Sequence, residues 1–314
     1  MTIQQAETIN TLLKTLQAEA VSRMEETIGK DSSLAERALY EERVSERLWF
    51  GNGWTTFPSS GEVHSVPISP GGVRAEWLIA ADAATDRAIM YLHGGGYVAG
   101  NLDTHRELVA RISKATKTRC VAVDYRRAPE SVFPAQLEDS LTVYKWLLSE
   151  GFKPKKIAII GDSCGGGLAI GTLVKLRELK LPLPAAAVLL SPWLDLESKG
   201  KSMWTNADTD FITRDLLLGL SDLFVGKNGD VKDPLASPIN ADLRGLPPIL
   251  VLVGDIEVLL DDSTVFADRA KKASVDVTLQ VWPGMPHIFP IFAPNLTEGQ
   301  EAIEKIGEFV RRWI

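Results

Sequence analysis

The chain has 314 residues, of which 45% are hydrophobic, and its formal net charge at pH 7 is −7. This length fits one large domain with an insertion or two small domains, and the apolar share is enough for a substantial core. The acidic balance and the lack of a Lys/Arg stripe argue against nucleic acid as a partner, and the lack of any apolar run near ~20 residues argues against membrane insertion.

The first 50 residues carry an amphipathic helical pattern. Apolar side chains recur at helical spacing from Leu12 through Leu16 to Met24. The first seven residues are polar and lack the apolar stretch of a signal peptide. The sequence therefore predicts a cytoplasmic location.

Short apolar runs alternate with helical patterns from residue 88 to residue 314. The predicted strands cover residues 88–92, 120–123, 157–160, 186–190, 249–253 and 277–281. The predicted helices cover residues 104–116, 134–150, 168–179, 263–273 and 298–314. This alternation predicts an α/β fold with a mostly parallel sheet that helices cover on both faces. An earlier alternating stretch, 63–79, predicts antiparallel strands at one edge of that sheet.

Two segments fall outside the alternation, residues 1–50 and residues 193–236. The second is rich in aromatic and aliphatic residues but has no strand pattern. We interpret both as helical pieces of a cap over the carboxyl edge of the sheet. The alternative is a set of ordinary surface helices that pack an apolar stripe on the core. The predicted organisation is a cap segment (1–50), core (51–192), a cap insertion (193–236) and core again (237–314).

The most informative motif is Gly-x-Ser-x-Gly at residues 161–165, between an apolar run and a run of small residues. This order predicts a strand, a sharp turn and a helix, with the Ser163 hydroxyl exposed on a strained backbone. The N-terminus of the following helix favours developing negative charge. We therefore interpret Ser163 as a nucleophile, rather than as part of a Gly-rich turn that binds a phosphate or nothing. Asp162 is expected to brace the turn.

A serine nucleophile needs a base, which in this motif follows it in the chain together with an acid. The chain has four histidines, and only His287 comes after Ser163. Its loop follows the predicted strand 277–281, at an end of the sheet where catalytic groups collect. Elimination therefore selects His287 as the base.

The acid should lie on the loop after the strand 249–253. Asp255 and Glu257 follow the strand directly, and the residues alone do not separate them. Asp261 and Asp262 are further candidates, but they look like the start of the next helix, where carboxylates favour the positive end of the dipole.

Attack on a carbonyl builds an oxyanion, which needs hydrogen-bond donors. The backbone N–H of Cys164 is one candidate. The loop after the strand 88–92 reads His-Gly-Gly-Gly-Tyr, and its glycines can turn their N–H groups inward. We expect donors from Gly95 and Gly96, with Gly94 as a further candidate, and we expect the histidine to order the loop. No Lys-Ser/Thr follows the glycines, which argues against a phosphate cradle.

Four motifs together resemble the hormone-sensitive-lipase-like carboxylesterases, a branch of the α/β-hydrolases. They are His-Gly-Gly-Gly at 93–96, Asp-Tyr-Arg-Arg-Ala-Pro-Glu at 124–130, Gly-Asp-Ser-Cys-Gly-Gly at 161–166 and Pro-His at 286–287. The resemblance spans residues 60–314, and the motifs occur in the family's order. It implies an α/β-hydrolase fold with an eight-stranded sheet and a helical cap. It also implies hydrolysis of carboxylic esters with short to medium acyl chains.

The resemblance also bears on the acid. The family's usual motif is Asp-Pro-Leu-x-Asp, whose first residue is catalytic. Matching Leu259 and Asp261 to this motif puts Glu257 at the catalytic position, 30 residues before His287. The resemblance therefore favours Glu257 over Asp255, although a glutamate without a following proline departs from the family pattern.

Two further positions concern the same motifs. Cys164 stands where the family usually has alanine, and because only its backbone N–H serves the oxyanion, we expect activity to survive. In the 124–130 motif, where Arg127 occupies a variable position, a purely structural interpretation is a salt bridge between Arg126 and Glu130 that holds a buried loop.

The sequence thus predicts a serine carboxylesterase that uses Ser163, Glu257 and His287 and forms an acyl-enzyme. The side chains expected to contact substrate are Tyr97, Trp204, Phe211, Ile212 and Ile288. No metal, nucleotide or flavin cofactor is required, and two cysteines give neither a disulfide framework nor metal-ligand spacing.

Three alternatives remain open. A lactonase or an amidase would use the same triad. A ligand-binding receptor on the same fold belongs to a different class, and the related plant hormone receptors lack the catalytic histidine, so His287 argues against it. The expected partner is a small-molecule ester, and the resemblance also suggests a homodimer built through the strand 277–281 and the last helix.

Overall fold

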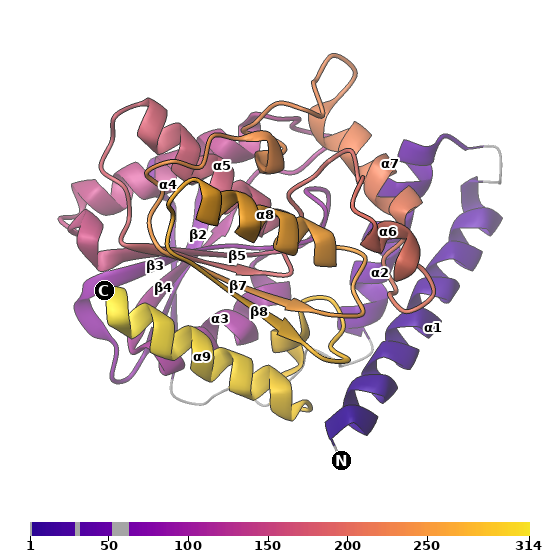
Figure 1. Cartoon of the computed structure of the whole chain (residues 1–314), viewed down its shortest axis with the longest axis horizontal. Helices are drawn as coiled ribbons and strands as arrows, with labels where there is room; N and C mark the ends of the chain where they lie inside the picture. The colour runs from indigo at the N-terminus through magenta and orange to yellow at the C-terminus, as the bar shows by residue number, and fades with distance from the viewer. Residues whose placement is uncertain (1, 29–31, 52–62) are drawn as a thin grey trace.

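The computed structural model describes residues 2–28, 32–51 and 63–314 (Figure 1). Residues 52–62, which the sequence assigns to the start of the core, lie outside the described residues, as do residues 1 and 29–31 of the first cap segment. The described strands are β1 (Val63–Ile68), β2 (Arg74–Ala80), β3 (Ala84–Leu92), β4 (Thr118–Asp124), β5 (Ile157–Asp162), β6 (Ala186–Leu190), β7 (Ile249–Gly254) and β8 (Val277–Trp282).

These strands form one eight-stranded sheet in the order β1-β2-β4-β3-β5-β6-β7-β8. β1 pairs antiparallel with β2, and β2 pairs antiparallel with β4, whereas every later pairing is parallel. The predicted α/β fold with a mostly parallel eight-stranded sheet is therefore confirmed, and its antiparallel part lies at the edge that the alternating pattern indicates.

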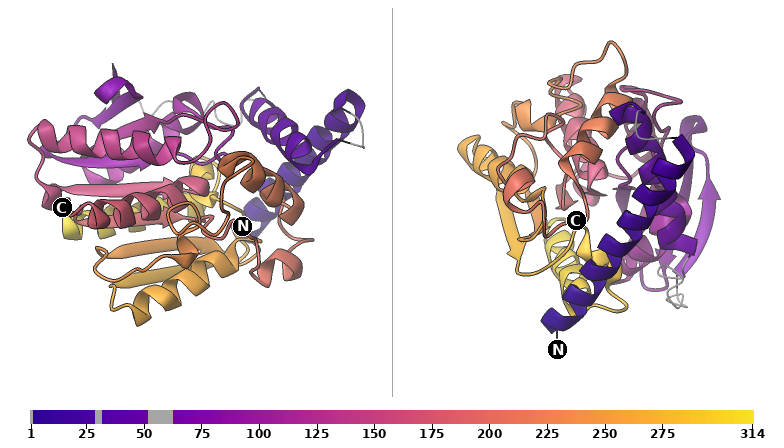
Figure 2. Two further views of the ribbon diagram at one scale, coloured as in Figure 1. Left: turned by 90° about the horizontal axis from the view of Figure 1, so that it is seen from above. Right: turned by 90° about the vertical axis from the view of Figure 1, so that its right-hand side faces the viewer.

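Helices cover both faces of the sheet (Figures 1 and 2). The helices are α1 (Thr2–Ile28), α2 (Leu34–Gly51), α3 (Leu102–Thr116), α4 (Ala135–Ser149), α5 (Cys164–Glu178), α6 (Ser202–Thr205), α7 (Arg214–Val225), α8 (Leu260–Lys272) and α9 (Thr297–Trp313). Short 3-10 turns occur at Pro70–Gly72, Pro154–Lys156, Pro238–Asn240 and Phe289–Phe292. α3 packs with α9 on one face, and α4 packs with α5 on the other face, where α8 also lies. None of the described helices combines the length and the hydropathy that a membrane span needs.

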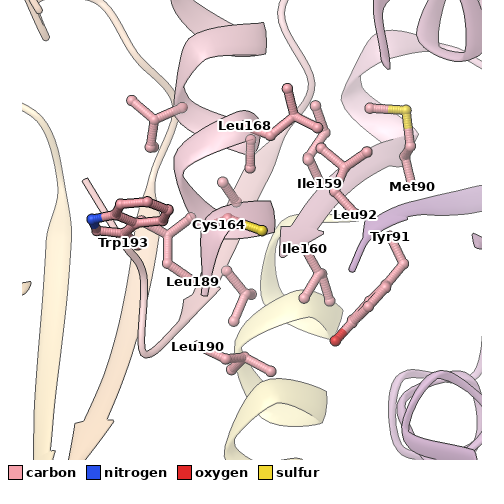
Figure 3. Packing of buried hydrophobic residues seen from close by; sticks show 14 of the residues in the cluster. Met90, Tyr91, Leu92, Ile159, Ile160, Cys164, Leu168, Leu189, Leu190 and Trp193 are labelled. Atoms are coloured by element: carbon pink, nitrogen blue, oxygen red, sulfur yellow. The ribbon is translucent and has the colours of Figure 1, made fainter. Parts of the chain in front are cut away.

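The central strands are buried along their whole length. Every residue of β5, β6 and β7 is buried, because helices cover both sides of these strands. Figure 3 shows side chains such as Met90, Ile159 and Leu189 packed together with Leu168 of α5. Each such aliphatic side chain stabilises the fold by about 1.5–3 kcal/mol through its burial. This core holds the strand ends, and the loops that follow them, in fixed positions.

Helices from the two segments outside the strand–helix alternation, 1–50 and 193–236, meet at one end of the sheet. α1 packs on α2, and α2 packs on α7. Figure 1 shows α1, α2, α6 and α7 gathered at the end toward which the arrows of β7 and β8 point. Within residues 193–236, only α6 and α7 are α-helical, and turns and loops make up the rest.

The salt bridge predicted between Arg126 and Glu130 is wrong. Arg126 faces the start of α4, where its guanidinium pairs with Asp139 at 2.8 Å. Glu130 instead pairs with Arg43 of α2 at 2.8 Å. The loop after β4 turns the two side chains to different neighbours, so the acidic residue ties α2 to the core.

Candidate active site

Ser163 occupies the turn between β5 and α5, as the sequence predicts. Its φ of 51° and ψ of −125° are strained for a residue with a side chain. Neighbouring chain fixes this conformation: the Ser163 N–H donates to the carbonyl oxygen of Leu190 at 2.8 Å, and its own carbonyl accepts the N–H of Trp193 at 2.9 Å. Close packing also needs Gly165, because a Cβ there would collide with the carbonyl oxygen of Leu92.

His287 and Glu257 form a buried pair beside this turn. Glu257 follows β7 and His287 follows β8, and the carboxyl ends of these neighbouring parallel strands bring the two loops together. The Nδ1–H of His287 donates to Oε2 of Glu257 at 2.9 Å. Their exposed fractions are 3% and 0%. With Nδ1 donating, Nε2 is left as an acceptor.

The environment of His287 favours a strong base. Burial alone would lower its pKa, but the hydrogen bond and the charge of Glu257 outweigh burial and raise the pKa of His287 above its ordinary value. Ser163 and His287 line the same pocket. The Ser163 hydroxyl makes no hydrogen bond to another described residue, His287 included.

Ser191 is a member of the site that the sequence reasoning missed. Its hydroxyl donates to Oε1 of Glu257 at 2.8 Å and accepts the N–H of Ile288 at 2.9 Å. The N–H of Gly254 also donates to Oε1 of Glu257, at 2.5 Å. Ser191 thus joins the acid to the residue next to His287. The only signal in the sequence is its position directly after the predicted strand 186–190.

The other acid candidates point elsewhere. Asp255 accepts the N–H of Gly284 at 2.6 Å and so shapes the turn before His287. Asp261 accepts a backbone N–H of α6, and Asp262 accepts two backbone N–H groups of the loop after β6. Among the candidates, the structure brings Glu257 alone to the imidazole.

The glycine loop presents backbone donors to the pocket. Gly95 has φ +108° and Gly96 has φ +57°, which glycine adopts readily, and both line the pocket. Neither N–H bonds to a described residue. Cys164 is the first residue of α5, where N–H groups precede the helical ladder. The N–H of Gly94, by contrast, donates to Asp162 at 3.0 Å, which removes Gly94 from the candidate donors.

Asp162, the last residue of β5, supports the turn that carries Ser163. It is fully buried, and it accepts the Tyr91 hydroxyl at 2.7 Å and the Nε2–H of His105 at 3.2 Å. Burial alone would raise the pKa of Asp162. The charge of His105 and the hydrogen bonds from His105 and Tyr91 outweigh burial, so the pKa of Asp162 lies below its ordinary value. The ionised carboxylate therefore fixes the glycine loop against the strand that carries Ser163.

His93 orders the glycine loop. Its ring stacks on Tyr125 with centroids 4.2 Å apart, and its Nδ1 lies 2.7 Å from the carbonyl oxygen of Gly94. Burial lowers its pKa to about 3, with the nearby His105 acting in the same direction. The imidazole of His93 is therefore neutral, and its contacts hold the glycine loop in place.

The Cys164 thiol is turned away from the pocket. Its Sγ accepts the N–H of Tyr97 at 3.2 Å and lies 3.7 Å from the Tyr125 hydroxyl. Burial raises the pKa of this thiol to about 12. The side chain is therefore unreactive, and it contacts the peptide that directly follows Gly96.

A pocket opens above Ser163 and His287. The three predicted contacts Phe211, Ile212 and Ile288 line it, and α7 adds an apolar wall that the sequence reasoning placed only in the cap: Leu216, Leu217 and Leu220. Side chains from the first two helices and from α3 make its polar part: Gln17, Glu42, Thr104 and His105. Residues from both segments outside the alternation, 1–50 and 193–236, thus contribute to the walls of the site.

Two predicted substrate contacts lie outside this pocket wall. The φ of 65° at Tyr97 turns its ring into the core, where it stacks on Phe224 with centroids 3.6 Å apart. Trp204 is 59% exposed on α6, and Arg214 lies over its ring at 5.0 Å. These placements argue against direct substrate contacts for both residues.

Comparison with known proteins agrees with this geometry. A family model for the α/β-hydrolase fold matches residues 89–291. An acetyl-hydrolase of Streptomyces hygroscopicus is 39% identical, over 84% of this chain and 88% of that protein. An esterase of Acinetobacter venetianus is 38% identical, over 81% of this chain and 84% of that protein. The crystal structure of an esterase from the bacterial hormone-sensitive lipase family is 42% identical, with a TM-score of 0.84, and covers 96% of this chain and 98% of its own. The chain belongs to the α/β-hydrolase fold family, and it is a carboxylic ester hydrolase of the hormone-sensitive-lipase-like branch.

Proposed function

We propose that this esterase hydrolyses esters of short to medium acyl length through an acyl-enzyme on Ser163. The Ser163 hydroxyl attacks the ester carbonyl while Nε2 of His287 takes its proton, and Glu257 stabilises the resulting imidazolium. The imidazolium then protonates the leaving alcohol. Water, activated by the same base, attacks the acyl-enzyme and releases the acid.

The developing oxyanion needs fixed donors in a site that excludes water. We propose that the N–H groups of Gly95, Gly96 and Cys164 supply them. The φ values of the glycines and the place of Cys164 at the start of α5 support this assignment. Such donors act at no cost of reorganisation when charge develops.

One observation carries the triad: the 2.9 Å hydrogen bond between His287 and Glu257, in a pocket that Ser163 also lines. The apolar wall formed by Phe211, Ile212 and α7 supports the proposed acyl-chain class. A hydrocarbon chain that lies on such a wall is removed from water, which favours binding by about 0.8 kcal/mol of free energy per buried CH₂ group.

We propose that residues 1–50 and 193–236 form the cap of the enzyme and that 51–192 and 237–314 form its core. The pocket supports this division, because Gln17 and Glu42 from the first segment and α7 from the second line it.

The homodimer and the cytoplasmic location stay predictions. β8 lies at an edge of the sheet, and Val281 on it is 43% exposed. A solution mass of twice 34.3 kDa would support a dimer.

The nucleophile is tested directly by the substitution Ser163→Ala. We expect it to lower kcat for p-nitrophenyl esters by about 10⁵-fold or more and to leave the thermal unfolding midpoint close to that of the wild type. A fluorophosphonate should label the wild-type chain at Ser163, detected by peptide mass spectrometry, and should not label the variant. Turnover near the wild-type rate in Ser163→Ala would overturn the proposal.

A further inference from the structure

The loop between α6 and α7 is hydrogen-bonded to the loop that carries Glu257. The side-chain amide of Asn206 donates to the carbonyl oxygens of Asp255 at 2.9 Å and of Glu257 at 2.8 Å. The hydroxyl of Thr209 donates to the carbonyl oxygen of Ile256 at 2.9 Å. A loop of the cap insertion thus binds three consecutive carbonyls around the acid.

Asp210 completes this contact from inside the protein. One carboxylate oxygen accepts the N–H of Val258 at 2.7 Å, next to the acid. The other accepts the N–H groups of Phe211 at 2.8 Å and Ile212 at 3.2 Å. Asp210 is 5% exposed. A single buried carboxylate therefore fixes the backbone of the acid loop and the backbone of the pocket wall to one another.

The residues that Asp210 fixes are those that touch the base and the pocket. The ring of Phe211 packs edge-on against His287, with centroids 6.2 Å apart and planes at 65°. Phe211 and Ile212 both line the pocket. Loss of the carboxylate would release the acid loop from one side and the packing of the imidazole from the other.

Asp210 also brings a second negative charge to the base. The charged groups that face His287 are Glu257 from the acid loop, Asp210 from the cap and Asp162 from β5. The groups that face Asp210 are His287 and Glu257. Burial raises the pKa of Asp210 to about 6, while His287 and the N–H donors act to lower it. Its carboxylate is therefore ionised near neutral pH.

We propose that Asp210 is a positioning residue of the hydrolytic site: it locks the cap wall to the acid loop, and its charge helps Glu257 to stabilise the protonated form of His287. This inference rests on the proposed triad. The charge of Asp210 thus adds to those of Glu257 and Asp162 in stabilising the imidazolium that forms when Ser163 loses its proton. The cap therefore takes part in the electrostatics of the reaction as well as in the shape of the pocket.

The test compares the full-length wild type with Asp210→Asn and measures kcat/KM for p-nitrophenyl butyrate against pH. Asparagine keeps the size and can still accept N–H groups with its oxygen, but its amide cannot accept the N–H of Val258 and carries no charge. We expect kcat to fall about tenfold and the acidic limb of kcat/KM to move to lower pH by about 0.5–1 unit. The sign follows because an imidazole that loses a nearby anion gives up its proton more easily.

A matched control is Asp208→Asn, two residues away on the same loop. The side chain of Asp208 is exposed, so the same loss of one charge should leave the acidic limb in place. Asp210→Glu keeps the charge but displaces the carboxylate, so it should lower kcat and leave the acidic limb within about 0.2 units of the wild type. Thermal unfolding will show whether Asp210→Asn folds. If it folds poorly, kcat of Asp210→Glu still tests the inference.

An acidic limb that stays at the wild-type pH in Asp210→Asn, or that moves equally in Asp208→Asn, overturns the inference. So does full wild-type kcat in Asp210→Glu. Failure of the triad itself has a different signature, because turnover would then survive Ser163→Ala. Failure of the present inference leaves that loss of turnover intact.

Discussion

The Ser191 hydroxyl donates a 2.8 Å hydrogen bond to Glu257, across 66 residues of sequence. The same hydroxyl accepts the N–H of Ile288, which follows His287. The acid is thereby held from the side opposite to the imidazole. In the proposed triad this serine positions the acid without touching a reacting atom.

Replacing Ser191 by alanine should weaken catalysis more than folding. The change leaves the N–H of Ile288 without its partner and removes one donor from Glu257, at a cost of about 1–3 kcal/mol. We expect kcat to fall about 10- to 100-fold. The control is Ser198→Ala: this serine also has positive φ and is buried, but its hydroxyl has no hydrogen-bond partner among the described residues. Equal losses of kcat in both variants would contradict the role of Ser191.

The two acids of the loop after β7 should respond differently to removal of their charge. Glu257→Gln removes the carboxylate that accepts Nδ1–H of His287, and we expect kcat/KM to fall about 10³- to 10⁴-fold. Asp255→Asn only weakens the bond to Gly284, and we expect a loss below about tenfold. Steady-state kinetics on one ester decides between them. A larger loss in Asp255→Asn would transfer the role of the acid to Asp255.

The pH dependence of kcat/KM should report the protonation of His287. Glu257 holds the pKa of His287 above its ordinary value of 6.5, although burial of the imidazole acts in the opposite direction. Below this pKa the imidazole carries a proton and cannot accept another from Ser163, so activity falls as the pH falls. We therefore expect an acidic limb with its midpoint above pH 6.5, measured with an ester whose own hydrolysis is subtracted. A midpoint below pH 6 would contradict the electrostatic account of the pair.

Local patterns were sufficient to select Ser163 and His287 as the candidate nucleophile and base. The strand-turn-helix around Ser163 depends on residues next to it in the chain, and the fold places its hydroxyl at the carboxyl end of the parallel sheet. His287 could be selected because no other histidine follows the serine. The acid was different, because Asp255 and Glu257 both follow β7 closely and the directions of their side chains in the fold separate them. That choice depends on Gly284 and Ser191, which are remote in sequence.

The helical segments outside the alternation could be predicted in outline but not in detail. Apolar spacing in α7 predicts a buried face, yet it does not say that Leu217 would face a pocket rather than the core. Asp210 gave no signal, since its partner Val258 is 48 residues away. Tyr97 and Trp204 are predicted from residue type, but backbone torsion turns the first inward and the short helix α6 holds the second at the surface.

The Cys164 thiol should resist alkylation although its residue adjoins the nucleophile. Burial raises its pKa to about 12, so the reactive thiolate is scarce at pH 8. We expect iodoacetamide to leave activity unchanged in the folded enzyme and to modify the cysteine only after denaturation, as mass spectrometry of digests will show. Cys164→Ala should lower kcat less than about tenfold, because the backbone donor remains while the contact to the N–H of Tyr97 is lost. Rapid alkylation with inactivation would show that the thiol is accessible.

The apolar wall of α7 should set the acyl-chain preference. Leu217 lines the pocket, so Leu217→Trp should occupy space that a longer chain needs and leave room for an acetyl group. Across p-nitrophenyl esters from acetate to octanoate, we expect kcat/KM for the longer chains to fall about tenfold or more relative to acetate. Trp204→Ala is the control, because that side chain lies on the surface, and its profile of chain lengths should match the wild type. If Trp204→Ala changes the profile and Leu217→Trp does not, substrate passes over α6 and the wall assigned to α7 is not the acyl site.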